Sequence, residues 1–319
     1  MMRRPLIAVL GPTGTGKTGI ALHVAEAVEA EIISVDSRQA YRGMTVGTAA
    51  PTAAELERVP HHGVGFLAPG ERYGAGRFGR LSRDWMAEIR GRNREPMLVG
   101  GTGFFYRSLV RPIFREPELD PDRRRRLEAW IEGREPSRLA DWVHALDPAL
   151  ADRLTVLDPQ RAQRALEIAL LTGRPLTWWQ RHGVPEAEPV DALPFVLELA
   201  PEEHRRRLRR RAETMLDGGW REEVEHLLDA GYGRASIPFR TIGYGSVAEW
   251  LGGGISRDDA LACILRDTWA YARRQRTWFR HQMPPGAIRL DAAEAPDVLA
   301  ERIVHAARGD RRDSNEGKR

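Results

Sequence analysis

The most chemically informative part of the sequence is a glycine-rich stretch close to its start. It follows an apolar run at residues 6–10 and reads Gly11-Pro12-Thr13-Gly14-Thr15-Gly16-Lys17-Thr18, which matches the pattern G-x-x-x-x-G-K-[ST]. The glycines of this pattern let the backbone turn tightly, so that several N–H groups and the start of the next helix face an anion. Lys17 is expected to reach the distal phosphate, and the Thr18 hydroxyl to hold Mg²⁺. The stretch therefore predicts a diphosphate or triphosphate ligand without naming a reaction.

Composition sets the lysine of this stretch apart from the other basic residues. Only two of the 49 basic residues are lysines, Lys17 and Lys318, and the second stands in a polar tail. A general bias toward arginine explains most of this imbalance. The exception nevertheless falls where a compact ammonium suits a phosphate better than a planar guanidinium.

Two further polar positions follow apolar runs that are predicted to be strands. Asp36 comes directly after residues 31–35, and Thr102 follows residues 96–99 and two glycines. Since ligands of parallel α/β sheets bind beyond the carboxyl ends of the strands, both side chains are expected beside the phosphate loop. Asp36 has three possible roles: metal ligand, general base, or cap of a turn. Thr102 either offers its hydroxyl to an anion or simply marks a tight turn.

The alternation of apolar runs and amphipathic segments predicts the fold class. Strands alternate with helices up to about residue 110, helical patterns alone fill residues 115–190, and an apolar run at 195–199 restores a strand. This order predicts an α/β protein with a parallel sheet core of the P-loop NTPase type and an α-helical insertion domain. The core would comprise residues 1–114 and 191–307, the insertion 115–190, and a disordered tail 308–319.

Charge and composition limit the possible partners. Net charge is only +4, but arginines cluster at 123–126, 205–211 and 273–280. One such run usually marks a solvated helix face, whereas three in a phosphate-binding protein leave nucleic acid open as a partner. The single cysteine excludes an internal disulfide, and no apolar run is long enough to span a membrane. A cytoplasmic monomer is expected.

Adjacent His61 and His62 lack a nearby acidic cluster, so no metal is expected there.

Several motifs together resemble one family, the tRNA dimethylallyltransferases, also called tRNA isopentenyltransferases. The resemblance covers nearly the whole chain in family order, from residue 6 to about 281. Besides the phosphate loop it rests on these motifs: Asp36-Ser37-Arg38-Gln39-Ala40-Tyr41-Arg42-Gly43-Met44, Gly47-Thr48-Ala49, Val59-Pro60-His61-His62, Val99-Gly100-Gly101-Thr102-Gly103, Asp158-Pro159-Gln160-Arg161, and Thr268 with Tyr271-Ala272-Arg273-Arg274-Gln275-Arg276-Thr277-Trp278-Phe279-Arg280.

The resemblance implies an activity and assigns residues to it. A dimethylallyl group would move from dimethylallyl diphosphate to N6 of an adenine in tRNA, at position 37 beside the anticodon. Asp36 would accept the N6 proton, Thr102 would lie near the reacting centre, and Lys17 and Arg211 would bind the diphosphate with the loop and Mg²⁺. The resemblance implies these tRNA-binding residues: Asp36, Ser37, Arg38, Gln39, Thr102, Arg124, Gln160, Arg161, Ala162, Gln163 and Arg164.

The sequence also departs from the family pattern and leaves other functions open. Ala50 stands where a lysine is common, Gly65 where an aspartate is common, and Gly245-Ser246 where Lys-Glu is usual. The residues alone also permit a small-molecule kinase, an isopentenyltransferase that acts on free adenine nucleotide, or a non-catalytic RNA-binding ATPase. A kinase would need a second metal-holding carboxylate besides Asp36.

Overall fold

The computed structural model describes residues 5–115, 117–153, 158–234 and 236–309. The chain divides into two compact units, one made of residues 1–110 and 190–319 and the other of residues 111–189. The expected domain boundaries were 1–114, 115–190 and 191–307. The expected tail began at residue 308, but Arg308 is the last residue of a helix, so that boundary is wrong. Residues 310–319 of the tail lie outside the described residues.

A six-stranded, entirely parallel sheet forms the centre of the first unit. The strand order is β3-β2-β4-β1-β5-β6. The strands are β1 (Leu6–Leu10), β2 (Ala30–Val35), β3 (His61–His62), β4 (Glu95–Gly100), β5 (Ala192–Glu198) and β6 (Ile288–Asp291). Gly100 is in register with both Leu10 and Val35. The three strand ends from which the sequence predicted chemistry therefore lie side by side, as expected.

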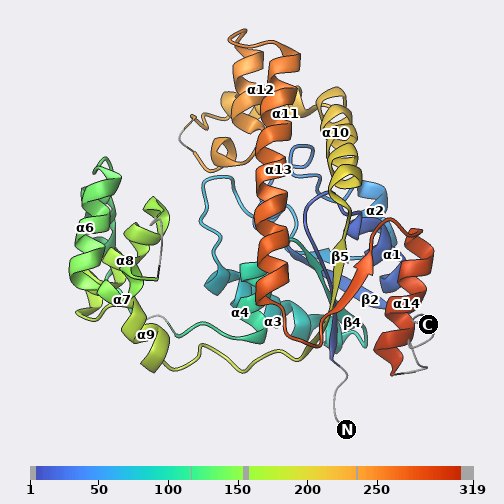
Figure 1. Cartoon of the computed structure of the whole chain (residues 1–319), viewed down its shortest axis with the longest axis horizontal. Helices are drawn as coiled ribbons and strands as arrows, with labels where there is room; N and C mark the ends of the chain where they lie inside the picture. The colour runs from blue at the N-terminus through green and yellow to red at the C-terminus, as the bar shows by residue number, and fades with distance from the viewer. Residues whose placement is uncertain (1–4, 116, 154–157, 235, 310–319) are drawn as a thin grey trace. The chain divides into compact units, whose positions relative to one another are not determined.

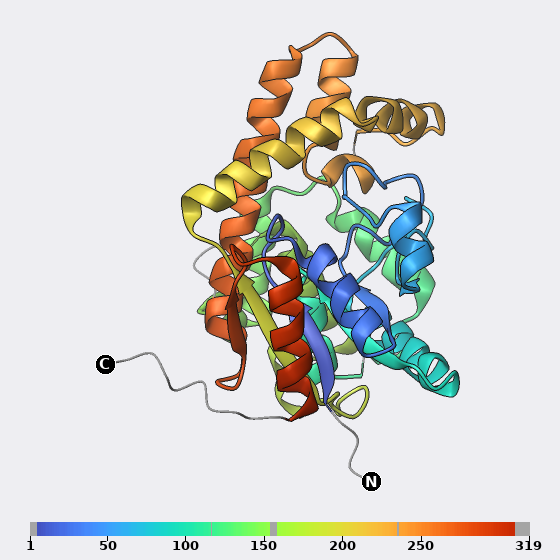
Figure 2. The same ribbon diagram turned by 90° about the vertical axis from the view of Figure 1, so that its right-hand side faces the viewer.

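Helices cover both faces of this sheet. The helices of the first unit are α1 (Lys17–Ala27), α2 (Ala53–Arg58), α3 (Ala75–Gly91), α4 (Gly103–Val110), α10 (Pro201–Asp217), α11 (Trp220–Asp229), α12 (Tyr244–Leu251), α13 (Arg257–Gln282) and α14 (Pro296–Arg308), with a 3₁₀ turn at Pro238–Arg240. One face packs on α1 and α14, and the other on α3, α4 and the end of α13. Figures 1 and 2 show these layers, with α14 and α1 in front of the strands in Figure 2. No helix in the described ranges combines the length and the apolar character needed to cross a bilayer.

A third apolar cluster, built from α10, α11, α12 and the first half of α13, lies beyond the carboxyl ends of the strands (Figure 1). Ala212 and Leu216 of α10 meet Leu261 and Ile264 of α13 in this cluster. Each large side chain buried there contributes about 1.5–3 kcal/mol to stability. The cluster holds α10 and α13 as a rigid pair above the phosphate loop.

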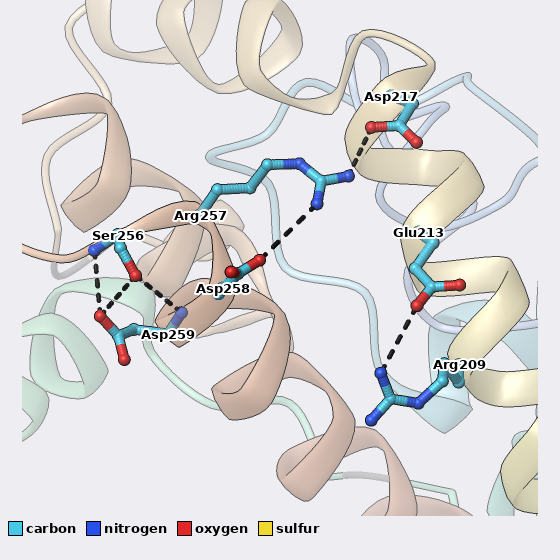
Figure 3. Close-up of polar contacts among 7 residues, drawn as sticks. All are labelled: Arg209, Glu213, Asp217, Ser256, Arg257, Asp258 and Asp259. Carbon is cyan, nitrogen blue, oxygen red and sulfur yellow. Dashed lines mark hydrogen bonds and ion pairs between the residues drawn. The ribbon is translucent and has the colours of Figure 1, made fainter.

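Polar contacts at the surface fix the ends of the same two helices (Figure 3). Ser256 caps the start of α13 through a reciprocal capping box with Asp259. Arg257 reaches from there to Asp217 at the end of α10, at 2.5 Å. Such exposed ion pairs contribute at most about 1 kcal/mol each, so they align helices that the apolar cluster already holds.

The second unit is helical, as the sequence predicted. Its helices are α5 (Pro121–Ile131), α6 (Pro136–Leu146), α7 (Pro148–Ala151), α8 (Pro159–Thr172) and α9 (Leu176–His182). Proline at the first position of α5, α6, α7 and α8 favours helix initiation, because its missing N–H is not needed there. A core that includes Val143 and Leu166 joins these helices. Buried Asp147 accepts hydrogen bonds from the Thr177 N–H and hydroxyl.

Some elements were not predicted from the sequence. The histidine pair forms β3, where His62 Nε2 lies 2.7 Å from a carboxylate oxygen of Glu31. Helices α12 and α14 were also missed: α12 is short, whereas the buried apolar residues of α14 at 299, 300, 303 and 304 follow a helical spacing that could have predicted it.

Gly100 provides a test of the sheet register. A Cβ at this position would lie 2.2 Å from the Val35 carbonyl oxygen of the neighbouring strand, and backbone there cannot move aside. We expect Gly100→Ala to lower the free energy of unfolding by about 2–3 kcal/mol or more, measured by urea denaturation. Gly91→Ala is the matched control, because a Cβ there meets nothing within 4 Å. Equal stability of the two variants would contradict the register.

Candidate active site

The glycine-rich stretch adopts the conformation that its pattern predicts. Gly14 and Gly16 have φ of 80° and 85°, in the left-handed region that favours glycine, and Gly16 is the N-cap of α1. A Cβ on Gly14 would also collide with the Leu208 side chain at 2.5 Å. The Lys17 ammonium donates a hydrogen bond to the Pro12 carbonyl at 2.8 Å. The backbone therefore turns at the start of α1, where N–H groups without helical partners attract an anion.

This loop opens into a cavity of about 930 Å³ within the first unit. The lining residues come from the phosphate loop, from the ends of β2 and β4, from α10 and α13, and from Trp220 and the segments 47–49 and 240–242. Those from the loop and strand ends are Thr13, Gly14, Gly16, Lys17, Thr18, Asp36, Ser37, Arg38, Gln39, Val99, Gly100 and Gly101. Of the other predicted loop residues, Gly11, Pro12 and Thr15 are buried beneath it.

Three side chains from two distant helices hold Thr13 of the loop. Gln275 of α13 accepts the Thr13 N–H at 2.9 Å and donates to the Gly101 carbonyl at 2.8 Å. Arg211 of α10 donates to the Thr13 hydroxyl at 3.0 Å. Buried His204 of α10 places Nε2 2.7 Å from the Thr13 carbonyl. The N–H, hydroxyl and carbonyl of one loop residue are therefore all fixed by the C-terminal half of the unit.

Asp36 caps a turn, which is one of the three roles that the sequence left open, and it also lines the cavity. Its Oδ1 accepts the backbone N–H of Arg38 at 2.7 Å and of Gln39 at 3.3 Å, which is the capping role. Its Oδ2 accepts no hydrogen bond from the residues that the structure describes, and the carboxylate lines the cavity. One oxygen therefore fixes the side chain, and the other is available to a ligand.

Thr102 lies behind Asp36 rather than on the cavity wall. Its hydroxyl accepts the Ser37 N–H at 3.2 Å, and its own N–H donates to Val35 at 3.0 Å. Burial raises the pKa of Tyr271 of α13 to about 12, and the nearby Thr102 side chain opposes the shift. Thr102 thus joins the end of β4 to the Asp36 turn.

The cavity carries a surplus of positive charge. Among the described residues that line it, seven are cationic and two are carboxylates: Lys17, Arg38, Arg207, Arg210, Arg211, Arg240 and Arg274 against Asp36 and Glu203. Burial lowers the pKa of Lys17 to about 7, and the charge of Arg211 lowers it further while Asp36 opposes the shift. Burial also lowers the pKa of Arg211. Such a site favours an anionic ligand, which relieves the repulsion between these cations.

The donor set at Thr18 suits a metal ion that is shared with a phosphate. Thr18 lines the cavity together with Asp36. The described part of the chain has no group of three or more His, Cys, Asp or Glu residues that could hold a metal by themselves. Mg²⁺ usually keeps several waters and binds through phosphates and few protein oxygens, so a hydroxyl beside a phosphate loop fits it.

The sequence named the α13 segment only as part of a family motif and did not predict that it lines the cavity. Thr268, Tyr271, Arg274 and Gln275 all line the cavity from this helix. Their spacing of three, six and seven residues places them on one helix face, a polar stripe that could have marked the site. The segment from Gly47 to Ala49 also lines the cavity, and it appeared in the sequence only as part of a motif.

The tRNA-binding residues expected in the second unit occupy different environments. Arg124 of α5 and Arg164 of α8 both contact the buried carboxylate of Glu167, with Arg164 at 2.9 Å. Ala162 is buried in the helical core, so its side chain is not available to a ligand. Gln160 and Arg161 are exposed and Gln163 is partly exposed. Arg161 pairs with Asp158 at 3.0 Å.

The residues that depart from the family pattern lie in turns or at the start of a helix. Gly65 has φ of 59° and donates its N–H to the Gln39 carbonyl at 2.9 Å. The Ala50 N–H bonds the Thr45 carbonyl, and Gly245 and Ser246 lie in the first turn of α12.

Family models match nearly the whole of this architecture. One described as IPP transferase matches residues 39–282, and one described as isopentenyl transferase matches residues 5–61, which contain the phosphate loop and Asp36. The chain belongs to the IPP transferase family. The matched segments include every residue that holds Thr13.

Two relatives that this chain covers almost completely are both named tRNA dimethylallyltransferase. The tRNA dimethylallyltransferase of Desulfosudis oleivorans is 38% identical over 293 residues, which cover 91% of this chain and 92% of the relative. That of Desulforudis audaxviator is 35% identical over 302 residues, covering 94% and 96%. The chain therefore spans these relatives nearly end to end.

Solved structures share the fold. The full-length tRNA isopentenylpyrophosphate transferase of Bacillus halodurans is 31% identical, covers 96% of each chain and has a TM-score of 0.69. A eukaryotic dimethylallyltransferase, solved in snapshots of its action on tRNA, is 25% identical with a TM-score of 0.81 and covers 98% of this chain and 82% of that one. The sheet with its α/β core is thus that of tRNA isopentenyltransferases.

The lowered pKa of Lys17 predicts that anion binding takes up a proton. At about pH 8 the Lys17 amine is mostly neutral in the free protein, and a bound diphosphate favours the ammonium form. The affinity gained from this ammonium is complete below pH 7 and declines as the pH rises above about 7. We expect the protein to take up about one proton more per inorganic pyrophosphate at pH 8 than the Lys17→Met variant does.

Calorimetry in two buffers of different ionisation enthalpy measures this proton uptake. Lys17→Met is the control, because the protonation of pyrophosphate itself contributes equally to both proteins. Equal uptake by both at pH 8 would contradict the account.

Proposed function

We propose that this chain transfers the dimethylallyl group of dimethylallyl diphosphate to N6 of the tRNA adenine that follows the anticodon. The observation that carries the proposal is that a phosphate loop, the cations Lys17 and Arg211, and the Asp36 carboxylate share one cavity. Relatives named for this activity, 35–38% identical over most of the chain, support it.

The phosphate-loop side of the cavity, where the donor would bind, can stabilise the leaving diphosphate. The carbon–oxygen bond of the donor breaks as N6 forms a bond to the same carbon, and the electron pair leaves with the diphosphate. Charge therefore accumulates on the diphosphate, where the N–H groups of the loop at residues 14–18, Lys17 and Arg211 stabilise it. Fixed donors of this kind act without reorganising, since Thr13 and Arg211 are already held together. Mg²⁺ at Thr18 would add positive charge to the departing diphosphate.

The Asp36 side of the cavity, where the adenine would bind, can take up the proton that N6 loses. N6 carries an additional proton once its bond to carbon forms, and Asp36 accepts that proton on Oδ2. The hydrogen bonds from Arg38 and Gln39 to Oδ1 hold the carboxylate in one orientation. Thr102 supports this turn through Ser37. Thr102 is therefore proposed to position the base rather than to touch the reacting atoms.

Access to the cavity requires the adenine to leave the stack of its loop. This costs a few kcal/mol, and less for an unpaired base. We propose that Ser37, Arg38 and Gln39 contact the exposed nucleotide, and that Arg124, Gln160, Arg161, Gln163 and Arg164 of the second unit contact the RNA. Arginine placed by carboxylates such as Glu167 is suited to phosphates, because its planar fork binds them in pairs of hydrogen bonds.

The alternative functions have less support. A kinase needs a further carboxylate for its metal, and Glu203, the one acidic residue besides Asp36 among the described residues that line the cavity, is already paired with Arg206 and Arg207. An enzyme acting on free nucleotide has no use for a separate helical unit. The monomeric state stays a prediction, and a tRNA substrate supports a cytoplasmic location.

A transfer assay tests the proposal. The protein is incubated with labelled dimethylallyl diphosphate, Mg²⁺ and unmodified tRNA, and the digested RNA is examined for N6-dimethylallyladenosine. Labelled adenosine in the tRNA is expected. Label on free nucleotide alone, or consumption of ATP without label, would overturn the proposal.

Asp36→Asn separates the base role from the capping role. The amide oxygen of asparagine can still accept the N–H groups of Arg38 and Gln39, but asparagine cannot take a proton. We expect kcat to fall by about 10²-fold with little change in the KM for tRNA. Asp36→Ala, which also loses the turn cap, should be at least as slow. If Asp36→Asn kept a normal kcat, Asp36 would not be the base.

A further inference from the structure

Glu223, in the first turn of α11, accepts several hydrogen bonds beside the cavity although it does not line it. Its carboxylate is buried and accepts four hydrogen bonds from two separate segments. Oε2 accepts the Val46 N–H at 2.7 Å and the Thr45 hydroxyl at 3.1 Å. Oε1 accepts the Gly47 N–H at 2.9 Å and the Tyr244 hydroxyl at 2.7 Å.

The segment that Glu223 holds, residues 45–49, forms a wall of the cavity through Gly47, Thr48 and Ala49. Its backbone is under constraint. Ala49 has φ of 45°, which alanine rarely adopts. A Cβ on Gly47 would lie 2.1 Å from the Trp220 indole nitrogen, so the wall passes directly against that ring. A strained and closely packed segment keeps its shape only where the surrounding contacts fix it.

The same wall connects the donor and acceptor sides of the cavity. Arg211 reaches the Thr48 carbonyl at 3.5 Å, and the Gln39 amide donates to the Ala49 carbonyl at 2.9 Å. Arg211 belongs to the diphosphate side, and Gln39 belongs to the Asp36 turn. A shift of the wall would therefore change the position of both side chains relative to each other.

We propose that Glu223 is a positioning residue for the transfer reaction: by holding the backbone of residues 45–49, it fixes the spacing between Arg211 and the Asp36 turn. This inference rests on the proposed function. The chemistry of the side chain supports it, because a carboxylate can accept both backbone N–H groups at once, whereas an amide presents one oxygen and a donor that faces them. The start of α11 also favours a negative charge at this position.

Glu223→Gln tests the proposal in the full-length protein with dimethylallyl diphosphate and unmodified tRNA. The amide leaves one of the two N–H groups without an acceptor, so the wall moves. We expect kcat per folded molecule to fall by about tenfold or more, while the KM of each substrate changes by less than about threefold. The folded fraction is measured by thermal melting. Tyr244→Phe is the matched control, since it removes one donor to Glu223 from outside the wall and keeps both backbone contacts; its kcat should remain near that of the unaltered protein.

A double-mutant cycle with Gln39→Ala separates positioning from simple loss of folded protein. If Glu223 acts through the wall, its effect on kcat should shrink once Gln39 no longer holds the other end, so the two effects do not multiply. If the effects multiply fully, Glu223 is only structural and the proposal fails. Should Glu223→Gln not fold, Glu223→Asp replaces it, because the shorter carboxylate keeps the charge but withdraws from the wall.

The outcome also separates this inference from the function on which it rests. Absence of transfer by the unaltered protein would defeat the proposed function. Normal transfer by the unaltered protein with equal kcat for Glu223→Gln would defeat the positioning role alone.

Discussion

The structure of the cavity depends on how Thr13 is held. A phosphate loop is local in sequence, but here its N–H, hydroxyl and carbonyl are bound by Gln275, Arg211 and His204, which lie 191 to 262 residues further along the chain. Gln275 also ties the loop to Gly101 at the end of β4. The anion site is therefore complete only when α10 and α13 have packed onto the sheet. Their common apolar cluster supplies the stability that these few hydrogen bonds, at about 1 kcal/mol each, cannot supply alone.

The same arrangement explains how one cavity can serve two substrates that need groups of opposite charge. The leaving diphosphate needs concentrated positive charge, and the incoming amine needs a negative group to take its proton. Lys17 and Arg211 provide the positive charge, and Asp36 provides the negative group. Arg211 and Asp36 act on Lys17 in opposite directions, since Arg211 lowers its pKa and Asp36 raises it. Residues 45–49, held by Glu223, stand between the two sides.

The sequence predicted the parts of this site that are local. The phosphate loop, Asp36 and Thr102 each follow an apolar strand, and the register of parallel strands brings them together. The contacts of Thr13 could not be predicted, because they depend on how helices distant in sequence cross the sheet. The two-residue β3 is too short to show a pattern, whereas α14 has apolar residues at helical spacing and could have been predicted. The role of Glu223 was also hidden, since an acidic residue in a first helical turn usually needs no explanation beyond the helix dipole.

The most direct test of this account is the affinity for inorganic pyrophosphate, measured by calorimetry, of Gln275→Leu compared with Gln282→Leu. Both variants remove an amide from α13, but Gln282 is exposed at the end of the helix and makes no contact with the loop. The account predicts that Gln275→Leu binds pyrophosphate about tenfold or more weakly, because Thr13 and Gly101 lose their common partner, whereas Gln282→Leu binds normally. Equal affinities of the two variants, both folded, would show that the loop holds its shape without α13 and would contradict the account.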